Sequence, residues 1–192
     1  MERIKKGLLD SAELKKKVAD TLCGEIYKAA QLIKDSLAGG GKLLIMGNGG
    51  SAGDAQHIAA ELVGRFKKER KALPAIALTT NSSTLTALGN DYEYAVIFSR
   101  QIEAFARKGD VVMGITTSGN SENVIRGLKL ANEIGAVTIA LLGNTGGKAK
   151  DVANVSIIVP SNDTGRIQEV HITVGHLICE IIEQDLAKEN KI

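Results

Sequence analysis

Five short, continuous apolar runs constrain the fold of this chain more than any other feature. The runs are KLLIM (42–46), AIAL (75–78), VVMGI (111–115), AVTIALL (136–142) and VSIIV (155–159). Most of them are followed by Gly, Asn, Ser or Thr and then by an amphipathic segment. A strand that is apolar without alternation is buried on both faces, which is typical of a parallel sheet covered by helices. The sequence therefore predicts an α/β fold, a three-layer sandwich around a five-stranded parallel sheet.

Helical patterns flank these runs at both ends of the chain. From Glu2 to Ala38, apolar residues recur at steps of three and four until GGG at 39–41 ends the pattern. The segment from about Thr164 to Glu189 is predicted to be one long helix. No linker, low-complexity tract or repeat divides the chain, so we expect a single domain over residues 1–192. Residues 1–38 would be a helical extension used in oligomer contacts, because long apolar terminal helices indicate surface that needs a partner.

Composition excludes several classes of function. Lys and Arg number 24 against 22 Asp and Glu, and aromatic residues make up 3% with no Trp, so neither a basic field nor a base-stacking surface for nucleic acid is expected. No apolar run reaches transmembrane length, and MERIKKGLLD lacks the apolar stretch of a signal peptide. We therefore expect no membrane association and a cytoplasmic location. Cys23 and Cys179 lie in helical apolar patterns and are interpreted as small core residues.

The segment GNGGSA at 47–52 matches the loose G-x-G-x-x-A pattern of dinucleotide-binding loops. Such a site also needs an acid after the next strand to bind the ribose, but here that strand ends in LTTN. A P-loop is disfavoured as well, because GNTGGK at 143–148 is one residue short between its glycines and Ala149 follows the lysine. We therefore expect no nucleotide cofactor and interpret 47–52 as a phosphate or sugar cradle at a helix N-terminus.

The segment TTSGNSENV at 116–124 concentrates hydroxyl groups between a predicted strand and a predicted helix. Thr116, Thr117, Ser118 and Ser121 supply four hydroxyls, and hydroxyls with backbone amides at a helix start can surround a phosphate. The alternative is an ordinary helix cap made by Ser121 or Asn120. Because a cap requires one hydroxyl and this loop offers four, phosphate binding is the favoured interpretation.

Two further segments carry residues suited to acid–base or metal chemistry. His57 and Glu61 are four residues apart, so they share one face of the helix after the glycine loop. Glu61 is either a solvated helix residue or, because its surroundings are small and apolar, a partly enclosed acid or base. Gln168 and His176 lie along one stripe of the last helix, where a histidine is often a core residue. Brought together, the four side chains would form a divalent metal site of zinc type.

These segments together resemble the sugar isomerase (SIS) family and, more closely, the phosphoheptose isomerases. The resemblance covers almost the whole chain: the helical N-terminus, GNGGS, H-x-x-x-E, LTALGNDY at 85–92, TSGNS at 117–121, and RIQE followed by His176. It implies a Rossmann-like SIS fold and an aldose–ketose isomerase. The implied reaction converts D-sedoheptulose 7-phosphate to D-glycero-D-manno-heptose 7-phosphate through an enediol(ate). This is the first step of nucleotide-activated heptose biosynthesis, which serves lipopolysaccharide or other surface glycans.

The resemblance also implies roles for individual residues. Glu61 and His176 would be the catalytic acid–base pair, and zinc would be held by His57, Glu61, Gln168 and His176. The substrate would be bound by Asn48, Gly49, Gly50, Glu61, Asn90, Asp91, Thr116, Thr117, Ser118, Ser121 and Gln168. The family forms homotetramers with active sites at subunit interfaces. Gly165 stands where some relatives are expected to carry an acid.

Three other functions share part of this pattern. One is a non-catalytic SIS tetramer that binds the bacterial replication initiator protein and carries a segment very similar to LPAIAL at 73–78. The resemblance implies that this adaptor lacks equivalents of Glu61 and His176. A phosphosugar-binding regulator would keep 116–121 without the acid–base pair, and an isomerase of another phosphosugar would share the mechanism. Because this chain has both Glu61 and His176, we expect an enzyme.

Overall fold

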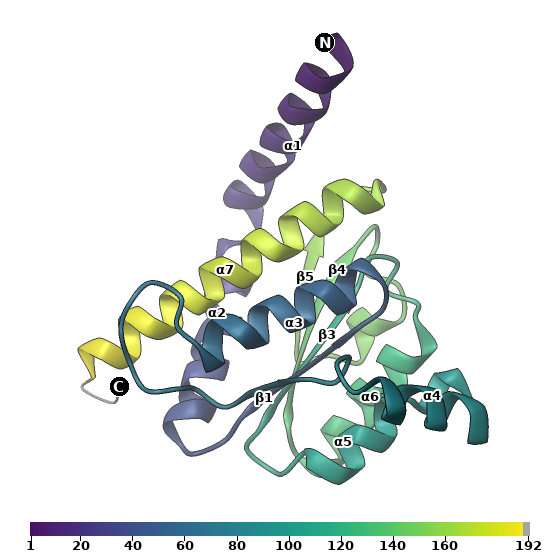
Figure 1. Cartoon of the computed structure of the whole chain (residues 1–192). Coiled ribbons are helices and arrows are strands. Elements are labelled where there is room, and N and C mark those ends of the chain that lie inside the picture. The colour runs from purple at the N-terminus through teal and green to yellow at the C-terminus, as the bar shows by residue number, and fades with distance from the viewer. Residues whose placement is uncertain (190–192) are drawn as a thin grey trace.

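One parallel sheet, with strand order β2-β1-β3-β4-β5, forms the centre of the computed structural model, which describes residues 1–189 (Figure 1). The strands are β1 (Leu43–Gly47), β2 (Ala75–Ala77), β3 (Val111–Thr116), β4 (Val137–Gly143) and β5 (Val155–Val159). Each strand begins and ends within one residue of an apolar run in the sequence, so the predicted five-stranded parallel sheet is confirmed.

Helices cover both faces of the sheet, which explains why the strands are apolar without alternation. Leu43 and Ile45 of β1 belong to one core cluster, whereas Leu44 and Met46 belong to the cluster on the opposite face. The first face is covered by α2 (Cys23–Ala38), α3 (Gly50–Val63) and α7 (Thr164–Lys188). The second is covered by α4 (Ser82–Asp91), η1 (Tyr94–Val96), α5 (Ser99–Phe105), α6 (Glu122–Ile134) and η2 (Ala149–Asp151).

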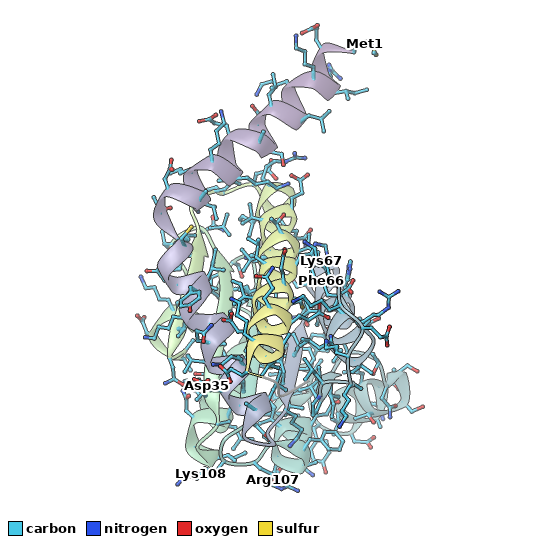
Figure 2. All side chains as sticks on the ribbon, turned by 90° about the vertical axis from the view of Figure 1, so that its left-hand side faces the viewer. Met1, Asp35, Phe66, Lys67, Arg107 and Lys108 are labelled. Carbon is cyan, nitrogen blue, oxygen red and sulfur yellow. The ribbon has the colours of Figure 1, made fainter. Side chains whose placement is uncertain are left out.

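The N-terminal segment forms two helices with a break at Leu22, where φ is −123°. The first of them, α1 (Glu2–Thr21), extends away from the body of the molecule in both views (Figures 1 and 2). Val18 is its one buried residue, and apolar side chains such as Leu8 and Leu9 are 68% and 59% exposed. The first half of α1 therefore has an apolar surface that the other described residues do not cover.

The two cysteines differ in their surroundings. Cys179 is buried in α7, as predicted. Cys23 is exposed, so its interpretation as a core residue is wrong. The reason is local: Cys23 is the first residue of α2, directly after the break, and the core covers this helix only from Ile26 onward. Among residues 1–189, no helix has both the length and the apolar character needed to cross a bilayer.

The order of the strands reverses direction between β1 and β3. From β1 the chain continues to β2 on one side, whereas β3, β4 and β5 follow one another on the other side. In open parallel sheets, ligands bind beyond the carboxyl ends of the strands at such a switch point. Gly47 at the end of β1 pairs with Ile115 near the end of β3, so the register brings the two polar loops that follow next to each other.

His171 makes the stability of this fold dependent on pH. It is fully buried on α7, and its Nε2–H donates to the carbonyl oxygen of Leu142 at 3.0 Å. Burial lowers the pKa of His171 to about 4, against the opposing effect of that hydrogen bond. Between pH 6.5 and 4 the unfolded chain therefore binds a proton that the folded chain does not, so stability falls as pH falls.

We expect this histidine to remove up to about 1.4 kcal/mol of unfolding free energy for each pH unit in that window. Urea denaturation at pH 7 and pH 5 measures the loss. His171→Gln should show a smaller loss over the same interval, because the other two histidines are unchanged in both proteins. Equal losses in the two proteins would contradict the assignment.

Candidate active site

A pocket of about 300 Å³ lies at the switch point of the sheet. It is formed by the loop after β1, the loop after β3 and the first turns of α7. Its lining is Asn48, Gly49, Gly50, Ser51, Ile115, Thr116, Thr117, Ser118, Ser121, Thr164 and Gln168. Gly50 and Gln168 touch here, since a Cβ added at Gly50 would lie 2.5 Å from Gln168 Nε2. Glycine at position 50 therefore lets α7 approach the start of α3.

The hydroxyls of the loop after β3 are linked to one another rather than used as helix caps. Thr116 Oγ1 lies 2.9 Å from Ser121 Oγ and 3.4 Å from Ser118 Oγ. Ser121 occupies the N-cap position of α6, but its side chain makes no cap hydrogen bond. The capping alternative thus does not account for these groups. A hydroxyl cluster at the start of a helix is suited to bind an anion.

A second group of polar residues lies where α3 and α7 pack together. His57 Nε2 is 3.1 Å from Glu61 Oε1 and 3.2 Å from His176 Nε2, although His57 and His176 are 119 positions apart in the sequence. The two helices come close because Gly175 has no side chain: a Cβ there would lie 2.7 Å from the side chain of Ile58. The Glu61 side chain is 24% exposed and thus partly enclosed, as predicted.

The three side chains fit a divalent metal ion by their chemistry. Their ligand atoms, two imidazole nitrogens and a carboxylate oxygen, all lie within 4.8 Å of one another. A proton can bridge only two such atoms at a time, whereas a cation can bind all three. Catalytic zinc sites often have three ligands of these types and an open fourth position. His57, Glu61 and His176 therefore fit zinc.

Comparison with known proteins agrees with this architecture. Residues 9–143 match the SIS domain family. A phosphoheptose isomerase of Aquifex aeolicus is 58% identical over 184 residues, which cover 96% of either chain. The solved structure of a phosphoheptose isomerase from Neisseria gonorrhoeae has a TM-score of 0.91 and 44% identity, and covers 95% of this chain and 98% of that one. The chain belongs to the phosphoheptose isomerase family.

Membership of the phosphoheptose isomerase family confirms two predictions from the sequence. The fold is the α/β SIS fold, because the Neisseria structure and one from Francisella tularensis, with a TM-score of 0.92 and 38% identity, share it over 95% of this chain. The protein is an enzyme of the aldose–ketose isomerase type, since relatives identical at more than half of the aligned positions are phosphoheptose isomerases. The individual site residues remain predictions.

The structure of this phosphoheptose isomerase family member does not bring all the predicted site residues together. Gln168 contacts Gly50 in the pocket, eight residues before His176 on α7, which is about 12 Å along a helix axis. Asn90 and Asp91 are exposed at the end of α4, where Asn90 Nδ2 donates to Asp91 Oδ1 at 2.9 Å, and they do not line the pocket. Within one chain, the pocket is thus separate both from the group of His57, Glu61 and His176 and from the pair of Asn90 and Asp91.

A hydrogen-bond network that was not predicted from the sequence holds the glycine loop. Asn48 and Asn123 exchange two side-chain hydrogen bonds of 2.9 Å, and the Tyr94 hydroxyl donates to Asn48 Oδ1 at 3.0 Å. Asn123 is 3% exposed. A polar side chain on the buried face of an amphipathic helix needs a partner, so its position next to the apolar pair Val124 and Ile125 was the available signal.

Asp54 is a second feature near the site that was not predicted from the sequence. It lies three residues before His57 on α3, and its Oδ2 atom is buried without a hydrogen-bond partner among the described residues. Burial raises the pKa of its carboxyl, and His57 opposes the shift. A buried carboxylate oxygen without a partner is unfavourable, so Asp54 is suited to pair with a group that residues 1–189 of one chain do not supply.

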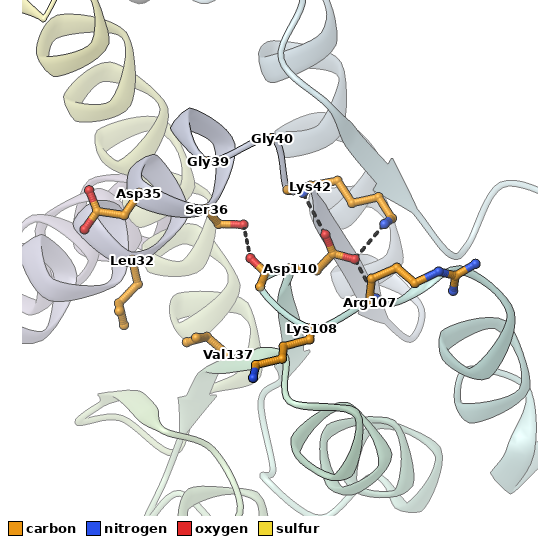
Figure 3. Close-up of a pocket in the computed structure, with 12 residues that line it drawn as sticks. Leu32, Asp35, Ser36, Gly39, Gly40, Lys42, Arg107, Lys108, Asp110 and Val137 are labelled. Carbon is orange, nitrogen blue, oxygen red and sulfur yellow. Dashed lines mark hydrogen bonds and ion pairs between the residues drawn. The ribbon is translucent and has the colours of Figure 1, made fainter.

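Another hollow, of about 490 Å³, lies at the opposite edge of the sheet, where the strands begin (Figure 3). Asp110 is its buried carboxylate, and Lys42 Nζ donates to it at 2.6 Å. The backbone N–H groups of Lys42 and Arg107 also donate to Asp110, at 3.0 Å and 2.7 Å. These contacts join the starts of β1 and β3. Because the Asp110 carboxylate is already paired in these contacts, its role is to stabilise the fold, and the hollow is not a candidate active site.

Proposed function

We propose that this protein converts D-sedoheptulose 7-phosphate to D-glycero-D-manno-heptose 7-phosphate, the first step of nucleotide-activated heptose biosynthesis. The observation that carries the proposal is the proximity of Glu61 and His176 to His57 in a chain of the phosphoheptose isomerase family. An acid–base pair of a carboxylate and an imidazole is what an aldose–ketose isomerisation requires.

The phosphate end of the substrate is proposed to bind in the pocket at the switch point. The hydroxyls of Thr116, Ser118 and Ser121 and the glycine loop at 47–50 support this, since they supply hydrogen-bond donors for phosphate oxygens. Thr117, Asn48 and Gln168 complete the proposed contacts. No lysine or arginine lines this pocket among residues 1–189, so hydrogen bonding would hold the phosphate.

The isomerisation moves one proton between adjacent carbons and one between adjacent oxygens. We assign Glu61 to the carbon-bound proton: the carboxylate removes it from C1, an enediol(ate) forms, and the proton returns at C2. His176 transfers the proton between the oxygens at C1 and C2, so the ketose and the aldose differ only in the positions of these protons. Glu61 ends each turnover ionised, as it began.

His57, Glu61, Gln168 and His176 are the proposed zinc ligands. The donor set of three that converges between α3 and α7 supports His57, Glu61 and His176, whereas Gln168 lies against Gly50 in the pocket and would have to turn away from it to reach the same ion. When bound, a divalent ion polarises the substrate carbonyl and stabilises the charge of the enediolate. The protein side chains orient the substrate and carry the protons.

A homotetramer with active sites at subunit interfaces is part of the proposal. The uncovered apolar surface of α1 supports it, and so does the position of Asn90 and Asp91 outside the pocket of their own chain. In an assembly, residues 1–38 would make contacts between subunits, and the two residues would reach the substrate of a neighbouring copy. A cytoplasmic location fits such a biosynthetic enzyme.

The purified protein is expected to convert sedoheptulose 7-phosphate to an aldoheptose phosphate, detected by NMR of the product. It should contain zinc, lose activity on treatment with a chelator and recover on addition of zinc. Activity that survives the chelator in zinc-free protein would remove the metal from the proposal. A wild-type protein that is inert on the heptulose phosphate but binds a replication initiator protein would favour the adaptor, and turnover of a pentose or hexose phosphate alone would change the substrate.

A further inference from the structure

The segment between α3 and β2 is hydrogen-bonded to α7 although it contains neither helix nor strand. The backbone N–H groups of Phe66, Lys67 and Lys68 donate to the carboxylate of Glu183 at 2.8, 2.8 and 3.1 Å. The Glu183 side chain is 1% exposed. Burial disfavours its charged form, but these donors and Arg70 outweigh that effect and hold the pKa of Glu183 below its ordinary value. Glu183 is therefore a buried, charged anchor for residues 66–68.

Arg70 completes this anchor from the other side. Its Nε donates to Glu183 Oε1 at 2.8 Å, and its side chain is also 1% exposed. Its remaining N–H groups donate to backbone carbonyl oxygens, including those of Glu61 and Leu62 at the end of α3, both at 2.8 Å. These carbonyls have no partner within the helix, so Arg70 closes its C-terminus. We call Arg70 and Glu183 the buried latch.

The latch holds Phe66 against His176. The two rings are stacked with centroids 5.4 Å apart and planes at 26°. His57 meets His176 edge-on, with centroids 4.9 Å apart and planes at 69°. Phe66 and Lys67 lie beside α7 in Figure 2, and Lys67 Nζ bonds Glu180 of α7 at 2.8 Å. The imidazole of His176 is thus contacted by one ring on its face and by another at its edge.

We propose that Phe66 is a positioning residue for His176, and that the buried latch keeps it there. An imidazole that transfers a proton between two substrate oxygens must keep its ring in one orientation, and a stacked ring restricts rotation about the last side-chain bond. This inference rests on the proposed function for the role of His176. The stacking itself does not depend on that function.

Phe66→Leu removes the aromatic face and keeps an apolar side chain. We expect kcat to fall about three- to tenfold with KM unchanged, because aromatic pairs contribute on this scale and the substrate contacts lie elsewhere. Phe66→Tyr should restore kcat, since it keeps the ring. Phe105→Leu is the matched control, because Phe105 is an exposed ring at the end of α5. A kcat for Phe66→Leu equal to that of the control would overturn the proposal.

A spectroscopic measurement separates this proposal from the proposed function. The chain has three histidines, so histidine-labelled protein gives few ring resonances, which His→Gln variants assign. The Phe66 ring current should displace the His176 ring-proton resonances, and Phe66→Leu should remove the displacement while Phe66→Tyr keeps it. Unchanged His176 resonances in Phe66→Leu would overturn the stacking. An inert wild-type protein whose His176 resonances respond to Phe66→Leu would contradict the proposed function and leave the positioning of the ring supported.

Discussion

Glu61→Gln is expected to lower kcat on sedoheptulose 7-phosphate by about a thousandfold, in the middle of the range for loss of a general acid or base. The amide keeps the shape of the side chain but cannot take up a proton from carbon. The fold should be unaffected, because Glu61 is partly solvated and makes no buried ion pair. Steady-state kinetics measure the loss, and incorporation of solvent deuterium at the isomerised carbons reports the proton transfer directly.

Two controls make the Glu61 result specific. Glu69→Gln is a matched substitution on a side chain that is 90% exposed, and it should leave kcat unchanged. Metal content measured on Glu61→Gln separates loss of the base from loss of a zinc ligand. A variant that retains zinc and still fails to exchange the carbon-bound proton supports the role of Glu61 as the base. A kcat within tenfold of wild type would remove Glu61 from that role.

Arg70→Met is expected to lower the free energy of unfolding by about 3–5 kcal/mol. The substitution leaves the Glu183 carboxylate buried with its charge no longer balanced, and it removes the Arg70 donors from the Glu61 and Leu62 carbonyls, of which Leu62 keeps the backbone N–H of Leu73. Removing one partner of a buried, hydrogen-bonded pair costs more than the pair contributes, because the remaining charge stays desolvated. Urea denaturation at pH 7 measures the change.

The Arg100–Glu103 pair provides the control for this experiment. Arg100 Nη1 lies 2.9 Å from Glu103 Oε2, close to the 2.8 Å of the Arg70–Glu183 contact, but the two side chains are 48% and 60% exposed. Arg100→Met should therefore cost at most about 1 kcal/mol, since solvent screens exposed pairs. Similar losses for the two arginine variants would show that the burial of Arg70 and Glu183 has no energetic consequence.

The strands could be predicted from the sequence because each continuous apolar segment indicates, without reference to the rest of the chain, that it is buried on both faces. VSIIV at 155–159 became β5 without a change of boundary, and the helix that precedes β1 ends at Ala38, before the glycines, as predicted. The break at Leu22 and the exposure of Cys23 were not predicted. Apolar spacing continues across the break, so the pattern alone does not show which residues turn away from the core.

The candidate site, too, could be predicted from the sequence only in part. The i, i+4 spacing of His57 and Glu61 on one helix determined their proximity, because helical geometry places such residues on one face. The sequence also determined the parallel sheet and, through the loops after β1 and β3, the polar pocket at the switch point.

Only the tertiary structure decided that His176 meets His57, since the packing of α3 on α7 depends on close approach at Gly175 and Gly50. It also decided that Phe66 stacks on His176, because the buried ion pair of Arg70 and Glu183 holds the segment that follows α3 against α7. Such contacts depend on how whole helices pack, and the local periodicity of a sequence does not specify that packing.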